Sequence, residues 1–90
     1  MILAIDVGNT RIKTAVFEGA TILGSFVFSK NELEENIKNI LKKYKKVTHL
    51  VVSSVSDIEK QSFLAFENLV NIHFVSHKDS FPFINCTANI

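Results

Sequence analysis

Asp6-Val7-Gly8-Asn9-Thr10-Arg11 lies between two runs of strand-forming residues, 1–5 and 12–17. The first run is apolar at every position, which predicts a strand that is covered on both faces and central in its sheet. A carboxylate at the end of such a strand, followed at once by glycine and two small polar residues, predicts a tight turn with backbone N–H groups available to an anion. Phosphate beside a metal ion is the ligand that this chemistry favours.

The same turn has a simpler interpretation. Glycine and asparagine both tolerate positive φ, and short hairpins often need it, so Gly8 and Asn9 would also suit a hairpin that binds nothing. Asp6 favours the functional interpretation, because a carboxylate at the end of a buried strand has a desolvation cost that function commonly explains.

The pattern beyond the turn predicts an α/β order. Residues 12–17 and 21–28 are expected as the second and third strands of an antiparallel meander, and the third strand is apolar on both faces. Ser29 and Glu32 have the spacing of a capping box at a helix start. The apolar residues that then recur at helical spacing are Leu33, Ile37, Ile40, Leu41 and Tyr44. Residues 47–55 are expected as a fourth strand, parallel to the first because a helix connects them.

A second helix and a fifth strand complete the predicted order. Ser56 and Glu59 form another capping-box pattern, and the expected buried face of this helix consists of Ile58, Phe63, Phe66 and Leu69. Residues 71–75 are expected as a short strand. The pattern weakens after this point, and large apolar residues between positions 81 and 84 predict that later elements of a longer protein cover them.

Composition limits the classes of function. The chain has 90 residues, 47% of them hydrophobic, with ten basic and nine acidic side chains. This predicts one small folded domain without the basic excess of a nucleic-acid binder. Four lysines at positions 42, 43, 45 and 46 end the first predicted helix, where the helix dipole favours cations; a nucleic-acid patch is the alternative interpretation. The apolar start is too short for a signal peptide or a membrane span, so no membrane partner is expected.

The cysteine and the histidines add no predicted site. Cys86 is the single cysteine, so an intrachain disulfide is excluded and a reducing cytoplasm is favoured. The residues around Cys86 do not form a nucleophile signature. His49, His73 and His77 show no zinc-ligand spacing. We expect these side chains to be structural or incidental.

The predicted order of elements is that of an RNase H-like domain, with a mixed five-stranded sheet of order 3-2-1-4-5 and flanking helices. Ligands are expected at the carboxyl ends of the first and fourth strands, where Asp6 would meet Ser53, Ser54 and Val55. The fold alone leaves two chemistries open. A two-metal nuclease needs several carboxylates, whereas ATP phosphoryl transfer needs a glycine turn for phosphates and an aspartate for magnesium. The two serines, where a nuclease needs an acidic group, favour the kinase.

Asp6-Val7-Gly8-Asn9-Thr10-Arg11-Ile12-Lys13, followed by Ser-Ser-Val at the end of the fourth strand, resembles the opening of a type III pantothenate kinase. That family belongs to the acetate and sugar kinase, Hsp70 and actin (actin-like ATPase) superfamily. Sugar kinases of that superfamily more often carry Gly-Gly-Thr or Gly-Thr-Ser at the position of Gly8-Asn9-Thr10, so Asn9 favours the pantothenate kinases. The resemblance implies phosphorylation of pantothenate by ATP, the first step of coenzyme A synthesis. It also implies Mg²⁺, a monovalent cation (K⁺ or NH₄⁺) and a homodimer.

The resemblance gives residues 6–13 contacts to the ATP phosphates. Asp6 would hold Mg²⁺ through water, and Gly8 would let the turn approach the phosphates closely. Asn9 and Thr10 would donate hydrogen bonds to phosphate oxygens. Lys13 would either reach the phosphates as a point charge or line the edge of the sheet.

Other positions of the motif are less defined. Val7 and Ile12 belong to the phosphate-binding segment without an individual role, and Arg11 is the position that the motif fixes least. The Ser53 to Val55 segment either contacts substrate or only ends its strand.

The resemblance covers an N-terminal domain only. The family's catalytic base, an aspartate in a Gly-x-Asp-Arg string, and its second phosphate motif, Asp-x-Gly-Thr, do not occur in these 90 residues. No catalytic residue is therefore assigned within the chain, and the base is expected beyond Ile90. We expect residues 1–90 to form the nucleotide-binding domain of a longer protein and to be inactive alone. The alternatives are another sugar or acyl kinase of the superfamily and a non-catalytic nucleotide-binding regulatory protein.

Overall fold

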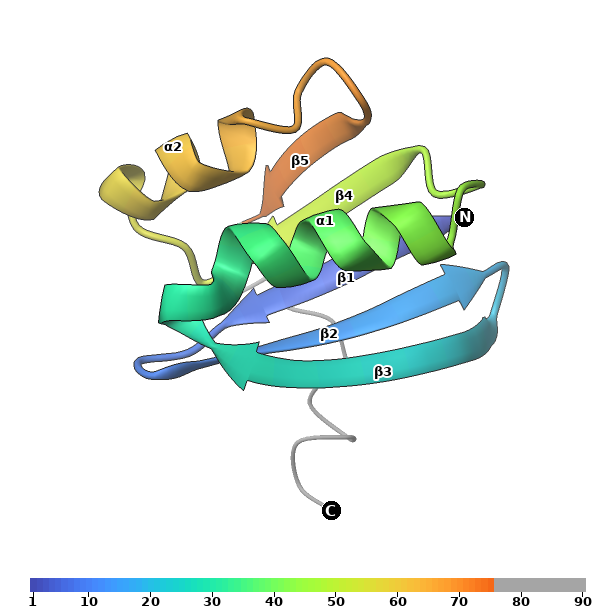
Figure 1. Cartoon of the computed structure of the whole chain (residues 1–90), viewed down its shortest axis with the longest axis horizontal. Helices are drawn as coiled ribbons and strands as arrows, with labels where there is room; N and C mark the ends of the chain where they lie inside the picture. The colour runs from blue at the N-terminus through green and yellow to red at the C-terminus, as the bar shows by residue number, and fades with distance from the viewer. Residues whose placement is uncertain (76–90) are drawn as a thin grey trace.

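The computed structural model describes residues 1–75. The expectations for positions 81–84, His77 and Cys86 lie outside the described residues, and so does the expectation of a catalytic base beyond Ile90, which stays a prediction. Figure 1 shows a twisted sheet with helices packed against it. The elements in chain order are β1 (Ile2–Val7), β2 (Arg11–Glu18), β3 (Thr21–Ser29), η1 (Lys30–Glu32), α1 (Leu33–Lys43), β4 (His49–Ser53), α2 (Asp57–Leu64) and β5 (Asn71–Val75). The strand order is β3-β2-β1-β4-β5, which confirms the predicted topology.

The central strand β1 separates two faces of the sheet. It pairs antiparallel with β2 and parallel with β4, as predicted. Leu3, Ile5 and Val7 belong to the main hydrophobic cluster, which also contains residues of both helices. Ala4 belongs to a second, smaller cluster. Because side chains alternate along a strand, Asp6 lies on the same face as Ala4, opposite the helices.

Both helices cover the face of the sheet that carries Leu3, Ile5 and Val7. Leu33, Ile37 and Ile40 of α1 are buried there, which confirms the predicted helical face. Phe63 of α2 is fully buried in the same cluster. Within residues 1–75 no helix is long and apolar enough to cross a membrane.

The two predicted capping boxes have different outcomes. At α2 the box is present, since Glu59 N donates to Ser56 Oγ at 3.2 Å and Ser56 N donates to Glu59 Oε1 at 3.1 Å. The box predicted at Ser29 and Glu32 is wrong. There the Ser29 hydroxyl donates to the Glu32 carboxylate at 3.0 Å. Ser29 is the N-cap of η1 and Glu32 is the N-cap of α1, and neither side chain makes a capping hydrogen bond. The physical reason is the 3-10 turn η1, which places the α-helix start after this pair.

The predicted buried face of α2 is half wrong. Phe63 and Phe66 are buried, but Ile58 is 83% exposed and Leu69 is 71% exposed. The helix ends at Leu64, so the helical spacing used for the prediction does not continue to position 69. Ile58 lies in the first turn of α2, on the side away from the core. The fourth strand is also shorter than the predicted range 47–55, because it begins at His49 and ends at Ser53.

Candidate phosphate site

The carboxyl ends of β1 and β4 meet at one edge of the sheet (Figure 1). Asp6 is in parallel register with Ser53 and in antiparallel register with Lys13. This confirms that two segments distant in sequence converge where the topology predicted. The fold therefore gathers a carboxylate, a hydroxyl and an ammonium group at one edge.

Ser53 lies beside Asp6, on the neighbouring strand β4. Its hydroxyl is 3.3 Å from Asp6 Oδ1 and 3.4 Å from the carbonyl oxygen of Ile5. The Ser53 side chain is fully buried, whereas Asp6 is partly exposed. Ser54 and Val55, which follow, are partly exposed, and Ser54 has a left-handed backbone with φ of 62°.

The turn after β1 is closed by a hydrogen bond from Gly8 N to Arg11 O at 2.8 Å. Within residues 1–75 only Ser54 and Gly19 have positive φ, so Gly8 and Asn9 do not use the positive φ that the ligand-free hairpin interpretation allowed them. Glycine is required for another reason: a Cβ at position 8 would lie 2.8 Å from the Arg11 carbonyl oxygen. A contact that short with a backbone atom forces the turn to move.

Two amides of the turn remain available to a ligand. The Gly8 amide is used in closing the turn, and the Thr10 carbonyl accepts from Lys30 N at 3.2 Å. The amides of Asn9 and Thr10 have no backbone partner among the hydrogen bonds within residues 1–75. Residues 8–11 are exposed as whole residues, so a ligand can approach this turn from solvent.

The flanks of the turn are anchored in the core. Val7 and Ile12 are buried in the main cluster, so they contribute backbone and not side chains to the site. Lys13 is partly buried and lies across from Asp6 on the face opposite the helices. The exposed Arg11 side chain is at the first position of β2.

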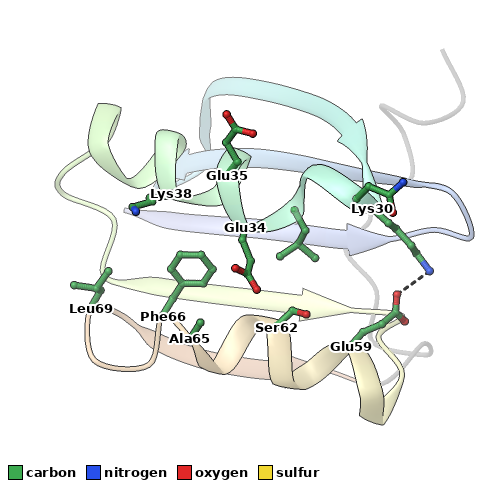
Figure 2. Close-up of a pocket in the computed structure, with 11 residues that line it drawn as sticks. Lys30, Glu34, Glu35, Lys38, Glu59, Ser62, Ala65, Phe66 and Leu69 are labelled. Atoms are coloured by element: carbon green, nitrogen blue, oxygen red, sulfur yellow. Dashed lines mark ion pairs between the residues drawn. The ribbon is translucent and has the colours of Figure 1, made fainter.

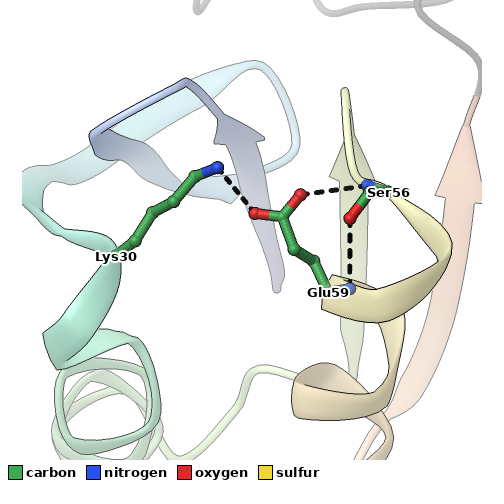
Figure 3. A network of polar contacts seen from close by, with 3 residues as sticks. All are labelled: Lys30, Ser56 and Glu59. Carbon is green, nitrogen blue, oxygen red and sulfur yellow. Dashed lines mark hydrogen bonds and ion pairs between the residues drawn. The ribbon is translucent and has the colours of Figure 1, made fainter.

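Lys30 connects this turn to the start of α2, and Figure 3 shows the contact between Lys30 and Glu59. Its amide donates to Thr10 O, and its Nζ lies 2.7 Å from Glu59 Oε2. Glu59 also accepts from Ser56 N in the capping box. The sequence analysis missed Lys30 and Glu59 as site-supporting residues, because no local pattern signals a pair 29 positions apart.

The Lys30 ion pair should make stability depend on pH. The hydrogen bond from Lys30, and then those from Ser56, hold the pKa of Glu59 below its usual 4.5, against the opposing effect of desolvation. A carboxyl with a lowered pKa in the folded state contributes stability above its unfolded pKa, and this contribution is lost as the pH falls through the folded pKa. We expect Glu59→Gln to lower the free energy of unfolding at neutral pH by about 0.5–1 kcal/mol, measured by urea denaturation.

Acidification provides the check on this prediction. The difference between Glu59→Gln and the unchanged chain should shrink once the pH falls below 4.5, where the carboxyl is increasingly protonated in both states. Glu18→Gln, which removes an exposed carboxylate at the end of β2, is the matched control and should have little effect at either pH. A difference for Glu59→Gln that is constant with pH would contradict the assignment of the stability to this ion pair.

An open groove of about 940 Å³ lies between α1 and α2, on the opposite face of the sheet from Asp6 (Figure 2). Its walls combine apolar residues with charges of both signs: Lys30, Asn31, Leu33, Glu34, Glu35, Lys38, Glu59, Ser62, Ala65, Phe66 and Leu69. Neither Asp6 nor residues 8–11 line it. The groove is therefore separate from the candidate phosphate site.

His49 and His73 form a contact between β4 and β5. Their Nδ1 and Nε2 atoms lie 3.3 Å apart, and the ring centroids are 5.4 Å apart. Residues 1–75 contain no group of three or more histidine, cysteine, aspartate or glutamate side chains that could hold a metal. Two ligands are fewer than a zinc site takes from a protein, so we interpret the pair as a structural contact.

The donor set at Asp6 suits magnesium bound through water. Mg²⁺ prefers oxygen ligands, retains several waters and is commonly held by one or two carboxylates together with substrate phosphates. Asp6 supplies one carboxylate at the sheet edge, beside the amides of Asn9 and Thr10. These residues therefore fit an ion that is shared with phosphate oxygens, and they do not form a complete cage.

Comparison with known proteins decides the family. A family model described as type III pantothenate kinase matches residues 2–89. The chain belongs to the type III pantothenate kinase family. The type III pantothenate kinase of Flavobacterium johnsoniae is 61% identical over 85 residues, which are 94% of this chain and 35% of that protein. The enzyme of Flavobacterium psychrophilum is 48% identical over the same shares. The chain thus spans about a third of the length of these relatives.

Solved structures agree on the fold. The Lmo2764 protein of Listeria monocytogenes, named for a proposed N-acetylmannosamine kinase activity, has a TM-score of 0.62 at 16% identity, covering 83% of this chain and 34% of that one. The Vms1 mitochondrial localization core has a TM-score of 0.52 at 17% identity, covering 83% of this chain and 44% of that one. Likeness at these identities shows the fold alone. The predicted RNase H-like, actin-like ATPase fold is confirmed.

Proposed function

We propose that the full-length protein transfers the γ-phosphoryl group of ATP to a hydroxyl of pantothenate, the first step of coenzyme A synthesis. The match of residues 2–89 to the type III pantothenate kinase family carries this proposal. Residues 6–13 would bind the ATP phosphates. The catalytic base and the second phosphate motif would come from sequence beyond Ile90, since neither string occurs in these 90 residues.

The residues in and beside the turn would have different roles. Asp6, at the carboxyl end of β1, would hold Mg²⁺ through water molecules. The amides of Asn9 and Thr10 donate to phosphate oxygens, and Lys13 adds a positive charge across from Asp6. Magnesium, when bound, neutralises charge that develops on the phosphates. Catalysis by such a site consists mainly of positioning and electrostatic stabilisation.

Family membership also supports finer proposals. A monovalent cation, K⁺ or NH₄⁺, a homodimer and a cytoplasmic location are what the family implies for the full-length protein. Ser54 and Val55, partly exposed at the end of β4, are the residues of that segment that would face substrate. The buried Ser53 would act from beside Asp6.

Turnover by the full-length protein is the decisive test. We expect ADP formation with Mg-ATP and pantothenate in a coupled assay, and none above background with a panel of sugars that includes N-acetylmannosamine. Transfer to a sugar or an acyl acceptor instead would favour another kinase of the superfamily. ATP binding without transfer to any acceptor would favour a regulatory protein.

The 90-residue chain alone should be inactive. It contains neither the Gly-x-Asp-Arg string nor the Asp-x-Gly-Thr string, so we expect no ATP hydrolysis and at most weak nucleotide binding. Isothermal titration calorimetry with Mg-ATP measures the second quantity. Tight binding by the 90-residue chain would contradict the proposal that the ATP site needs a second half.

A further inference from the structure

Ser53 is a buried polar residue next to the proposed phosphate site, and it has no direct contact with solvent or with a ligand bound from solvent. Its side chain is fully buried, and within residues 1–75 Thr14 is the one other buried polar side chain. Thr14 donates to the carbonyl oxygen of Phe26 at 3.1 Å, a contact inside the sheet. Ser53 instead faces a carboxylate, because its hydroxyl is 3.3 Å from Asp6 Oδ1.

The fold places this hydroxyl with little freedom. Ser53 is the last residue of β4 and is in parallel register with Asp6. The next residue, Ser54, has φ of 62°, a conformation that is unfavourable for a residue with a side chain. Strained residues of this kind concentrate at functional sites. The turn at Ser54 ends β4 directly after Ser53, which lies beside the Asp6 carboxylate.

One hydroxyl proton serves two acceptors here. Asp6 Oδ1 and the Ile5 carbonyl oxygen lie 3.3 and 3.4 Å away, both longer than the usual O–H···O distance of about 2.7–2.8 Å. The charged acceptor makes the stronger bond once the two oxygens approach. A hydroxyl bound to Oδ1 restricts rotation of the carboxylate and leaves Oδ2 for ligands at the sheet edge.

We propose that Ser53 is a positioning residue for metal–nucleotide binding, whose hydroxyl fixes the orientation of the Asp6 carboxylate from the buried side of the site. This proposal rests on the proposed function of Asp6 and extends it to the neighbouring strand β4. Because Ser53 is fully buried, it acts through Asp6 and not by contact with substrate. Partners of this kind set the affinity of a metal site through the ligand that they orient.

The test uses the full-length protein and two measurements. In Ser53→Ala, the Mg²⁺ concentration for half-maximal turnover should rise about tenfold, the lower end of what loss of an outer hydrogen-bond partner costs. Binding of Mn²⁺ with a non-hydrolysable ATP analogue, followed by electron paramagnetic resonance, should weaken by the same factor. The KM for pantothenate should stay within about twofold, since the hydroxyl does not touch that substrate.

Two further variants separate orientation from stability. Ser53→Thr keeps the hydroxyl and should keep the Mg²⁺ dependence, even if the added methyl lowers the melting temperature at this fully buried position. Ser25→Ala removes an exposed hydroxyl from β3 and should change neither measurement. Ser53→Cys, a poor donor of similar size, should behave like Ser53→Ala and replaces it if the alanine variant does not fold.

Two results would overturn the proposal. One is a Ser53→Ala or Ser53→Cys variant that melts earlier but binds Mn²⁺ and the analogue as the unchanged protein does. The other is a Ser53→Thr variant that loses metal binding as fully as Ser53→Ala. The binding measurement needs no turnover, so an unchanged protein that fails to phosphorylate pantothenate would contradict the proposed function and leave this test in place.

Discussion

Asp6→Asn in the full-length protein should lower kcat/KM for Mg-ATP by about 10²-fold or more, the size of effect expected when a preorganised charge is removed from a transition state. Asparagine has nearly the same shape and still offers an oxygen to the Ser53 hydroxyl, which lies 3.3 Å from Asp6 Oδ1. The fold should therefore survive, while the negative charge that attracts Mg²⁺ is lost. Steady-state kinetics at several Mg²⁺ concentrations measure the effect, and a thermal melt checks the fold.

Asp57→Asn is the matched control for this experiment. Asp57 carries a carboxylate that is 97% exposed at the start of α2, where it pairs with Lys60 at 3.4 Å. An exposed pair of this kind contributes about 0–1 kcal/mol to stability and has no reason to affect turnover. Unchanged kinetics in Asp6→Asn, or an equal loss in both variants, would remove Asp6 from the proposed mechanism.

The fold could be predicted because local patterns and topology agreed. The apolar run before Asp6 indicated a central strand, and the spacing of Leu33, Ile37 and Ile40 indicated the face of α1. A helix between two strands then required a parallel pair, which placed β4 beside β1. Once the order was fixed, the meeting of Asp6 with the end of β4 followed from geometry.

Errors arose where one local pattern had several structural solutions. The Ser29 and Glu32 spacing suits a capping box, but a 3-10 turn at this point lets the two side chains bond each other instead. Ile58 and Leu69 suit a helical face only if the helix continues, and α2 ends at Leu64. Helix ends depend on tertiary packing, which sequence spacing does not contain.

The interior of the site was beyond sequence reasoning for a different reason. The sequence offered two interpretations of Gly8, close approach of the turn to phosphates and tolerance of positive φ. The structure adds a third reason for glycine, which is the short distance from an added Cβ to a carbonyl oxygen three residues later. The bridge from Lys30 to Glu59 and the contact of Ser53 with Asp6 join residues 29 and 47 positions apart. Such contacts appear only when the register of the strands and the ends of the helices are known.

Lys30 links the turn of the candidate site to α2 through contacts that involve no bound ligand. Its amide holds Thr10 O at 3.2 Å, and its ammonium group holds Glu59 at 2.7 Å (Figure 3). The phosphate turn is thereby joined to the helix that follows β4. Because this link and the buried flanks Val7 and Ile12 hold the turn in place, it would lose little entropy on binding phosphate, which favours preorganised electrostatic stabilisation.

Gly8→Ala should be the second change with a large effect, because the new Cβ would lie 2.8 Å from the Arg11 carbonyl oxygen. The neighbour is backbone, so the contact is relieved only if the turn opens and the bond from Gly8 N to Arg11 O lengthens. That movement would displace the amides of Asn9 and Thr10 from the positions in which we propose that they bind the phosphates. We expect kcat/KM for Mg-ATP to fall by about 10²-fold, the cost of a displacement of about 1 Å in a positioned site.

Gly19→Ala separates loss of function from loss of stability. Gly19 has φ of 61° and no atom within 4 Å of an added Cβ, so alanine there is strained in its backbone but meets no neighbour. It should lower the free energy of unfolding by about 1–2 kcal/mol and leave the kinetics unchanged, because it lies in the hairpin at the opposite end of β2. For Gly8→Ala we expect the opposite, a loss of kcat/KM for Mg-ATP that is larger than its loss of stability explains. If Gly8→Ala binds and turns over Mg-ATP as Gly19→Ala does, then the prediction that the contact with the Arg11 carbonyl oxygen disturbs the proposed phosphate site is wrong.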